Sequence, residues 1–142
     1  MFVLNARFVN NTMDTDLIFL IGRILFGGFF AINGFNHFTK MKMLTGYTAS
    51  KGVPMAGFMV VLTGIMLFLG GLGIVLGIYI EIAATLIAVF LLFVSFAMHN
   101  FWKVQDPNQK MSEMINFMKN IALLGAALMM LMIPAPWPFS VF

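Results

Sequence analysis

Apolar residues are concentrated in four long stretches of the chain, and the short segments between them hold most of the charges. The stretches cover about residues 17–38, 55–77, 80–101 and 114–133. Each approaches the roughly 20 residues that a helix needs to cross the hydrocarbon core of a bilayer. A β-barrel strand would be shorter and would alternate in polarity, so only helices fit these stretches as spanning elements. The pattern therefore predicts an all-α protein, an integral membrane four-helix bundle.

The composition supports a membrane location for a chain whose 142 residues suffice for one domain, residues 1–142. Hydrophobic residues make up 61% of the chain and charged residues only 9%, whereas a soluble domain carries about 25% charged residues. The net charge of +3 does not indicate nucleic acid, because the basic residues form no continuous face. The expected partners are the lipid bilayer and either other membrane subunits or further copies of the chain.

The segments between the stretches contain turn formers and a lysine bias. Gly77-Ile78-Tyr79 predicts a tight hairpin, while residues 39–54 and 103–113 predict loops, the second with a turn at Asp106-Pro107-Asn108. Lysine is concentrated in these two loops and in the adjoining start of the fourth stretch, at Lys40, Lys42, Lys51, Lys103, Lys110 and Lys119. The positive-inside rule predicts a multi-pass protein with the lysine-rich loops in the cytoplasm and both termini outside.

Two of the predicted helices carry a stripe of small and polar residues at helical spacing. The stripes are Arg23, Gly27, Phe30, Gly34 and His37 in the first stretch, and Glu81, Thr85, Ala88, Leu92, Ser95 and His99 in the third. This composition is typical of helix contacts in lipid, so we expect the stripes to match end to end. Arg23 and Glu81 would then form an intramembrane ion pair near the outer end. Such a pair can fix packing alone or serve a function.

Polar residues from three predicted helices gather at similar depth near the inner end. The candidates are His37, His99, Asn100, Lys119 and Asn120, with Asn33 one turn from His37. Together they predict a polar pocket beneath the cytoplasmic surface, suited to a quinone headgroup, an anion or the transfer of protons. The alternative is a structural cap, in which Lys119 extends to water and the histidines bond to backbone carbonyls.

The residue types do not indicate a resident metal or a catalytic motif. The chain has no cysteine, which excludes an iron–sulfur cluster or a dithiol centre within it. His37, His99 and Glu113 lack the spacing of a zinc motif, and most of the 14 methionines lie singly in apolar stretches as packing residues do. No phosphate-binding, dinucleotide or nucleophile motif is present. A quinone is the one cofactor that the polar pocket suggests.

Several motifs, taken in order along the chain, resemble those of the DoxX family. They are Gly22-Arg23 with Asn33-Gly34-Phe35-Asn36-His37-Phe38, Ala49-Ser50-Lys51-Gly52-Val53-Pro54, Gly70-Gly71-Leu72-Gly73, His99-Asn100-Phe101-Trp102 and Asn116-Phe117-Met118-Lys119-Asn120. The resemblance implies a four-helix bundle of the cell inner membrane. Family members are associated with redox metabolism, some as subunits of thiosulfate:quinone oxidoreductase and some in membrane complexes with superoxide dismutase and a sulfurtransferase.

Two functions stay open on the sequence, and neither decides whether the protein is an enzyme. In the first, the chain is a redox-associated membrane subunit that binds a quinone among His37, His99, Lys119 and Asn120, with histidine exchanging a proton. In the second, it is a non-catalytic accessory or assembly subunit of a larger membrane complex. A third, a small transporter or channel, would require several copies because one chain has too few helices.

Overall fold

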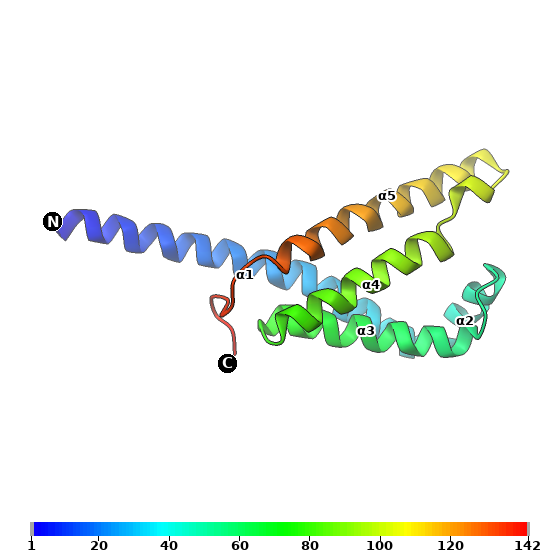
Figure 1. Ribbon diagram of the computed structural model, residues 1–142, viewed down its shortest axis with the longest axis horizontal. Helices are drawn as coiled ribbons and strands as arrows, with labels where there is room; N and C mark the ends of the chain where they lie inside the picture. Colours follow the sequence, from blue (N-terminus) through cyan, green and yellow to red (C-terminus); the bar gives the residue numbers. More distant parts are fainter. Residues whose placement is uncertain (1, 142) are drawn as a thin grey trace.

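The computed structural model describes the backbone of residues 2–141 and the side chains of residues 13–141. Within these residues every regular element is helical (Figure 1). The elements are α1 (Phe2–Thr39), α2 (Met41–Ser50), α3 (Ala56–Leu76), α4 (Ile80–Met98), the short 3-10 helix η1 (Phe101–Lys103) and α5 (Pro107–Met130). The predicted all-α class is confirmed: four long helices pack together, and α2 is an additional short one.

Within the described part of the chain, three segments are long and apolar enough to cross a membrane, namely Met13–Thr39, Ala56–Leu76 and Ile80–Lys103. Their outer surfaces are apolar too, with Ile18 70% and Leu25 69% exposed. Such large exposed side chains are expected where lipid, and not water, surrounds the helix. The fourth predicted span corresponds to α5, which packs along α4. It is not among the three, because charged and amide side chains occupy its first half.

The closest helix contact joins α1 to α3, and glycine allows it. A Cβ built on Gly27 would lie 2.7 Å from the carbonyl oxygen of Gly71, and one on Gly34 would lie 2.8 Å from that of Gly64. These distances are below van der Waals contact, so the two backbones approach one another where no side chain could fit. Small residues in helix contacts favour this kind of packing in lipid, where apolar burial alone drives little association.

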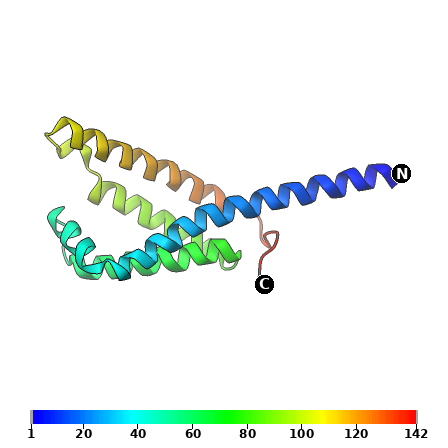
Figure 2. The ribbon, with the colours of Figure 1, turned by 180° about the vertical axis from the view of Figure 1, so that it is seen from behind.

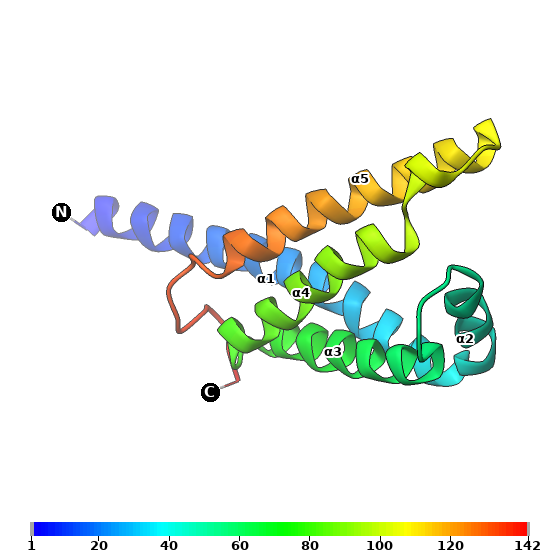
Figure 3. The same ribbon diagram turned by 45° about the vertical axis from the view of Figure 1, so that its right-hand side comes forward.

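The stripe predicted on the first helix faces inward, but α3 is its partner. Arg23 and Phe30 are each only 2% exposed. α3 packs along α1 and against α4 (Figures 2 and 3). The two helices that were expected to match along their length share few direct contacts. The prediction that the whole α4 stripe packs against α1 is therefore wrong in part, because Glu81, Thr85 and Leu92 are exposed. The physical reason is that α4 buries a neighbouring face of alanine and aliphatic side chains, which costs less than burying a carboxylate.

Two segments predicted as loops are helical. Residues 41–50 form α2, which turns Leu44 and Thr48 towards the rest of the molecule and keeps Gly46 on its exposed side. The predicted turn at Asp106 is the start of α5. The Asp106 side chain accepts a hydrogen bond of 2.7 Å from the backbone N–H of Gln109, and Pro107 occupies the first helical position. These residues are common at helix N-termini as well as in turns, which explains the error.

The predicted hairpin between the second and third apolar stretches is confirmed. Gly77 ends α3 with a φ of 71°, a left-handed conformation that glycine adopts without strain. The N–H of Ile78 then bonds the carbonyl of Gly73 at 3.0 Å, and α4 runs back along α3. Both chain ends lie on this hairpin's side of the molecule, while α2 and η1 lie at the other end (Figure 1). Which of these ends faces the cytoplasm stays a prediction.

The α1–α3 contact gives a matched pair of substitutions. Gly27→Ala should destabilise the protein by about 1–3 kcal/mol, because its Cβ would overlap the α3 backbone. Gly28→Ala should not, since a Cβ there meets no atom within 4 Å and alanine favours helix formation. Thermal unfolding in detergent measures both, and equal effects of the two variants would contradict the packing described.

Candidate functional site

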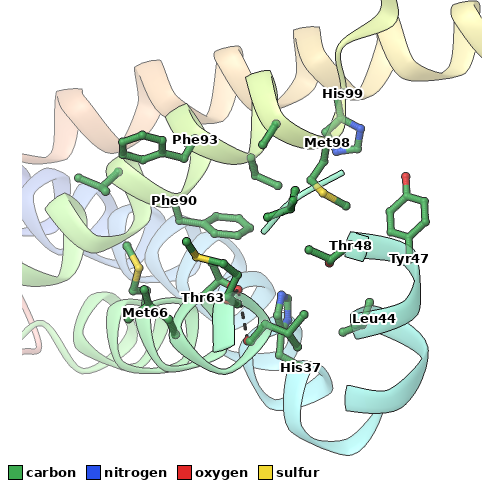
Figure 4. Close-up of a pocket in the computed structure, with 17 residues that line it drawn as sticks. His37, Leu44, Tyr47, Thr48, Thr63, Met66, Phe90, Phe93, Met98 and His99 are labelled. Atoms are coloured by element: carbon green, nitrogen blue, oxygen red, sulfur yellow. Dashed lines mark hydrogen bonds between the residues drawn. The ribbon is translucent and has the colours of Figure 1, made fainter. Parts of the chain in front are cut away.

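A cavity of about 490 Å³ lies between α2, α3 and α4 (Figure 4). Small-molecule sites have volumes of roughly 300–1,000 Å³, so this space is large enough for a ligand. Its walls are mainly apolar and include Met66, Phe90, Phe93 and Met98. The first helix contributes one residue, His37, from its last turn.

Two histidines give the cavity its polar character. His37 from α1 and His99 from the end of α4 lie on opposite sides of it, and Tyr47 and Thr48 of α2 lie between them in this view (Figure 4). Thr63 also lines the cavity, and its hydroxyl donates to the backbone carbonyl of Met59 at 2.6 Å. The site thus joins a long apolar wall to a few polar groups at one end.

Each imidazole is held through its Nδ1 atom. In His37 this atom lies 2.7 Å from the backbone carbonyl oxygen of Asn33, one turn earlier in α1. In His99 it lies 2.7 Å from the Oε2 atom of Glu113. A carbonyl oxygen and a carboxylate can only accept, so each Nδ1 carries the proton and donates. Both rings are fixed in orientation by these bonds.

The carboxylate of Glu113 connects three parts of the molecule at the cavity. It lies in the second turn of α5, is 6% exposed, and bonds His99 after α4 and Lys51 after α2. Burial alone would raise the pKa of this carboxyl. The hydrogen bonds from Lys51 and His99, together with the charge of Lys51, outweigh that effect and hold the pKa of Glu113 below its ordinary value.

Lys51 fastens α2 over the cavity. Its ammonium group pairs with Oε1 of Glu113 and lies 5.5 Å from the ring centre of Tyr47, within range of a cation–π contact. Burial alone would lower the pKa of Lys51, but the hydrogen bond and charge of Glu113, together with Tyr47, raise it above its ordinary value. Each partner therefore favours the charged form of the other.

The six residues predicted to form a polar pocket do not all meet. His37 and His99 line the cavity, whereas Asn33 contributes its backbone carbonyl to His37 and turns its amide to the Phe29 carbonyl. The other three lie away from the cavity lining, which does not include Asn100, Lys119 or Asn120. Lys119 is exposed and bonds Asn116 at 3.1 Å, one turn away on the same helix.

Arg23 meets the C-terminal tail and not Glu81. Its guanidinium donates to the carbonyl oxygens of Pro138 at 2.9 Å and Phe139 at 3.1 Å, and lies 5.9 Å from the ring centre of Trp137. Neither ion pair found among residues 13–141 includes Glu81, which is exposed on α4. The expected pair does not form because Glu81 lies on an exposed face of α4 and the tail supplies oxygens close to Arg23.

Sequence reasoning named Lys51 for orientation and within a DoxX-like motif, and Glu113 only as a weak zinc ligand. The available signal was that Glu113 directly precedes a stretch predicted to enter the membrane, where a carboxylate needs a cationic partner. In the part of the chain whose side chains are described, no group of three or more His, Cys, Asp or Glu could hold a metal ion. His99 and Glu113 lie together as two metal ligands could, but the third side chain beside them is Lys51, which does not bind a metal ion while it is paired with Glu113.

Comparison with known families agrees with the motifs. The family model for DoxX matches residues 18–100. The chain belongs to the DoxX family. In this DoxX protein the matched region runs from α1 to the end of α4 and contains His37, Lys51 and His99, whereas Glu113 lies beyond it. No curated protein and no solved structure matches the chain significantly.

The Lys51–Glu113 pair gives a prediction on stability. Glu113→Gln should lower the free energy of unfolding by about 1–3 kcal/mol, because it leaves Lys51 without its carboxylate. Lys51→Met should cost a similar amount, and the double variant less than the sum of the two, since the residues are coupled. Thermal unfolding in detergent gives all three values, with Glu81→Gln as the control that should change nothing. Additive effects would contradict the pair.

The same pair gives a pH dependence. The pKa of Glu113 is lower in the folded protein than in the unfolded chain. Its contribution to the free energy of unfolding is therefore complete above the ordinary carboxyl value of about 4.3 and is lost as pH falls through the folded pKa. The pKa of Lys51 is raised in the folded protein, so its contribution to the free energy of unfolding is complete below a pH of about 10.4. That contribution is lost as pH rises through the folded pKa. The stability difference between wild type and Glu113→Gln should therefore be widest near neutral pH and shrink in acid.

Arg23 gives a prediction on the tail. With Trp102→Phe as background, the fluorescence of Trp137 alone reports on the tail, since the chain has 2 tryptophans. Arg23→Gln should loosen the contact and make Trp137 more accessible to acrylamide. Glu81→Gln should leave quenching unchanged. Equal increases in both variants would favour the Arg23–Glu81 pair over the tail contacts.

Proposed function

We propose that this DoxX protein is a membrane subunit that binds a lipid-soluble ring compound of the quinone class in the cavity between α2, α3 and α4. One observation carries the proposal: an apolar cavity of about 490 Å³ with fixed imidazoles on opposite sides. Such a ligand has a flat ring with oxygen atoms at opposite edges and an apolar tail, which suits this distribution of polar and apolar groups.

The walls favour a ring with apolar substituents. Phe90 and Phe93 offer aromatic faces and edges, and Met66 and Met98 are flexible side chains that adapt to irregular shapes. Burial in such a site stabilises a ligand by roughly 25 cal/mol per Å² of apolar surface. The polar contacts then fix the orientation of the ring.

The cavity has exposed lining residues on α3 and α4, two helices that are apolar and long enough to cross a membrane. These residues include Leu62 of α3 and Phe93 and Ala97 of α4. A ligand dissolved in the bilayer would therefore reach the site by lateral diffusion between α3 and α4. This route fits a hydrophobic molecule better than a free ion, which would have to cross apolar surface to reach the histidines.

The chain supplies proton-exchanging groups, and because it has no cysteine it forms no iron–sulfur cluster or dithiol centre of its own. Histidine is the side chain whose ordinary pKa suits proton exchange near neutral pH. Electrons would pass between the bound ring and an associated protein. Proton exchange by this chain and electron transfer by an associated protein are what a redox-associated membrane subunit would combine.

The alternative is a non-catalytic accessory or assembly subunit, and one observation favours it. The N-terminal part of α1 extends well beyond the other helices (Figures 1 and 2). A projecting helix offers a surface on which a second membrane protein could pack. In this reading, the cavity would hold lipid or a side chain of the partner.

A cavity-filling substitution tests the proposal. Ala97→Phe places a large ring in the cavity and should weaken the binding of a decyl-substituted benzoquinone by about tenfold or more. Ala122→Phe is the matched control, because Ala122 is an exposed alanine on α5 and does not line the cavity. Binding is measured by equilibrium dialysis with the protein in lipid nanodiscs.

Wild-type binding that Ala97→Phe abolishes and Ala122→Phe preserves would support the site. Absence of saturable binding to the wild type would refute it. Co-purification with a second membrane protein in fixed ratio, together with that absence, would favour the accessory-subunit alternative.

A further inference from the structure

The two histidines that line the cavity are both held through the same ring atom, Nδ1. Each neutral imidazole has one N–H and one bare nitrogen. The N–H is used at Nδ1, by the Asn33 carbonyl in one ring and the Glu113 carboxylate in the other. Nε2 is then the bare nitrogen in both rings, and it accepts hydrogen bonds but cannot donate them.

The other polar side chains that line the cavity are not restricted to accepting hydrogen bonds in this way. Thr48 and Tyr47 carry hydroxyls, which rotate to donate or to accept. The Thr63 hydroxyl already donates to a backbone carbonyl. The nearby ammonium of Lys51 is directed to Glu113 and does not line the cavity. The two Nε2 atoms therefore decide which ligand oxygens the site accepts.

Resting on the proposed function, we propose that the cavity is selective for the reduced, hydroxyl-bearing form of the ring, a hydroquinone, over the quinone. A hydroquinone has an O–H at each of two opposite ring positions, and each can donate to an imidazole Nε2. A quinone has only carbonyl oxygens there. These would face the bare nitrogens without a hydrogen between them, which leaves buried acceptors unpaired.

Glu113 is a positioning residue for this selectivity. Its carboxylate can only accept, so it forces the proton of His99 onto Nδ1 and the lone pair onto Nε2. The amide of Gln at this position could donate as well as accept. Glu113→Gln would therefore release the tautomer of His99 and let Nε2 carry a proton that a quinone carbonyl could accept.

The first test reads the tautomers without a ligand. The chain has only 2 histidines, so ¹⁵N-histidine labelling gives the signals of two rings in the wild-type protein in nanodiscs. At a pH where the rings are neutral, both should show a protonated Nδ1 and a bare Nε2. His37→Phe assigns the two rings. A protonated Nε2 in the neutral form of both rings would overturn the proposal.

The second test compares one ring in two redox forms. Decyl-hydroquinone, kept reduced under argon, and the matching decyl-quinone are titrated against the protein in nanodiscs. The hydroquinone should bind about tenfold more tightly or better, an energy of one hydrogen bond's order. Glu113→Gln should shrink this ratio, whereas Lys119→Gln should preserve it, because Lys119 is exposed and away from the cavity.

The outcomes separate the two proposals. If neither form binds, the proposed function fails and this inference fails with it. If both bind equally, or the quinone binds more tightly, the site stands and its selectivity for the reduced form is wrong. If Glu113→Gln does not fold, His37→Phe gives an independent check, because His37 is oriented by a backbone carbonyl and should also reduce the ratio when replaced.

Discussion

The carboxylate of Glu113 lies where α5 passes the ends of α2 and α4, and most of the cavity's architecture depends on it. It binds the ammonium of Lys51 on one side and the ring of His99 on the other. The first contact keeps α2 over the cavity, and the second sets the proton position on an imidazole in its wall. A buried carboxylate is stable only with such partners. The burial of Glu113 therefore determines both the position of α2 and the orientation of the His99 ring.

The opposite end of the molecule is held in a different way. Arg23 is buried there, and two carbonyl oxygens of the C-terminal tail accept hydrogen bonds from its guanidinium while Trp137 packs against Phe19. Between the two ends, glycines bring α1 and α3 into backbone contact. The helices are thus fixed at both ends by polar contacts and in the middle by close packing, and the cavity occupies the region where α2 and α4 remain apart.

The sequence predicts the parts of this protein that depend on hydrophobicity and helical period. The long apolar stretches locate α3 and α4 closely, and helical spacing identifies the buried face of α1. Depth along a helix also suggested that His37 and His99 belong to one site. Depth does not give the direction in which a side chain points, so Lys119 and Asn120 were assigned to a cavity that they do not line.

Other features depend on contacts that a sequence does not display. The helix α2 is short and of mixed polarity, and its placement depends on Lys51 meeting Glu113, which is 62 residues away. The partner of Arg23 is a pair of backbone carbonyls, which any residue type could provide. Membership of the DoxX family places the chain in the membrane, but the ligand has to be argued from the geometry of the cavity.

Photo-crosslinking tests the central claim most directly. A quinone analogue with a photoreactive group on its ring would be activated in nanodiscs containing the protein, and the modified residues mapped by mass spectrometry. The account predicts adducts on the cavity wall, at Tyr47, Met66 or Met98, and their loss in competition with unmodified ligand. Adducts spread over the lipid-exposed faces of α1 and α5, unaffected by competition, would contradict a binding site in this cavity.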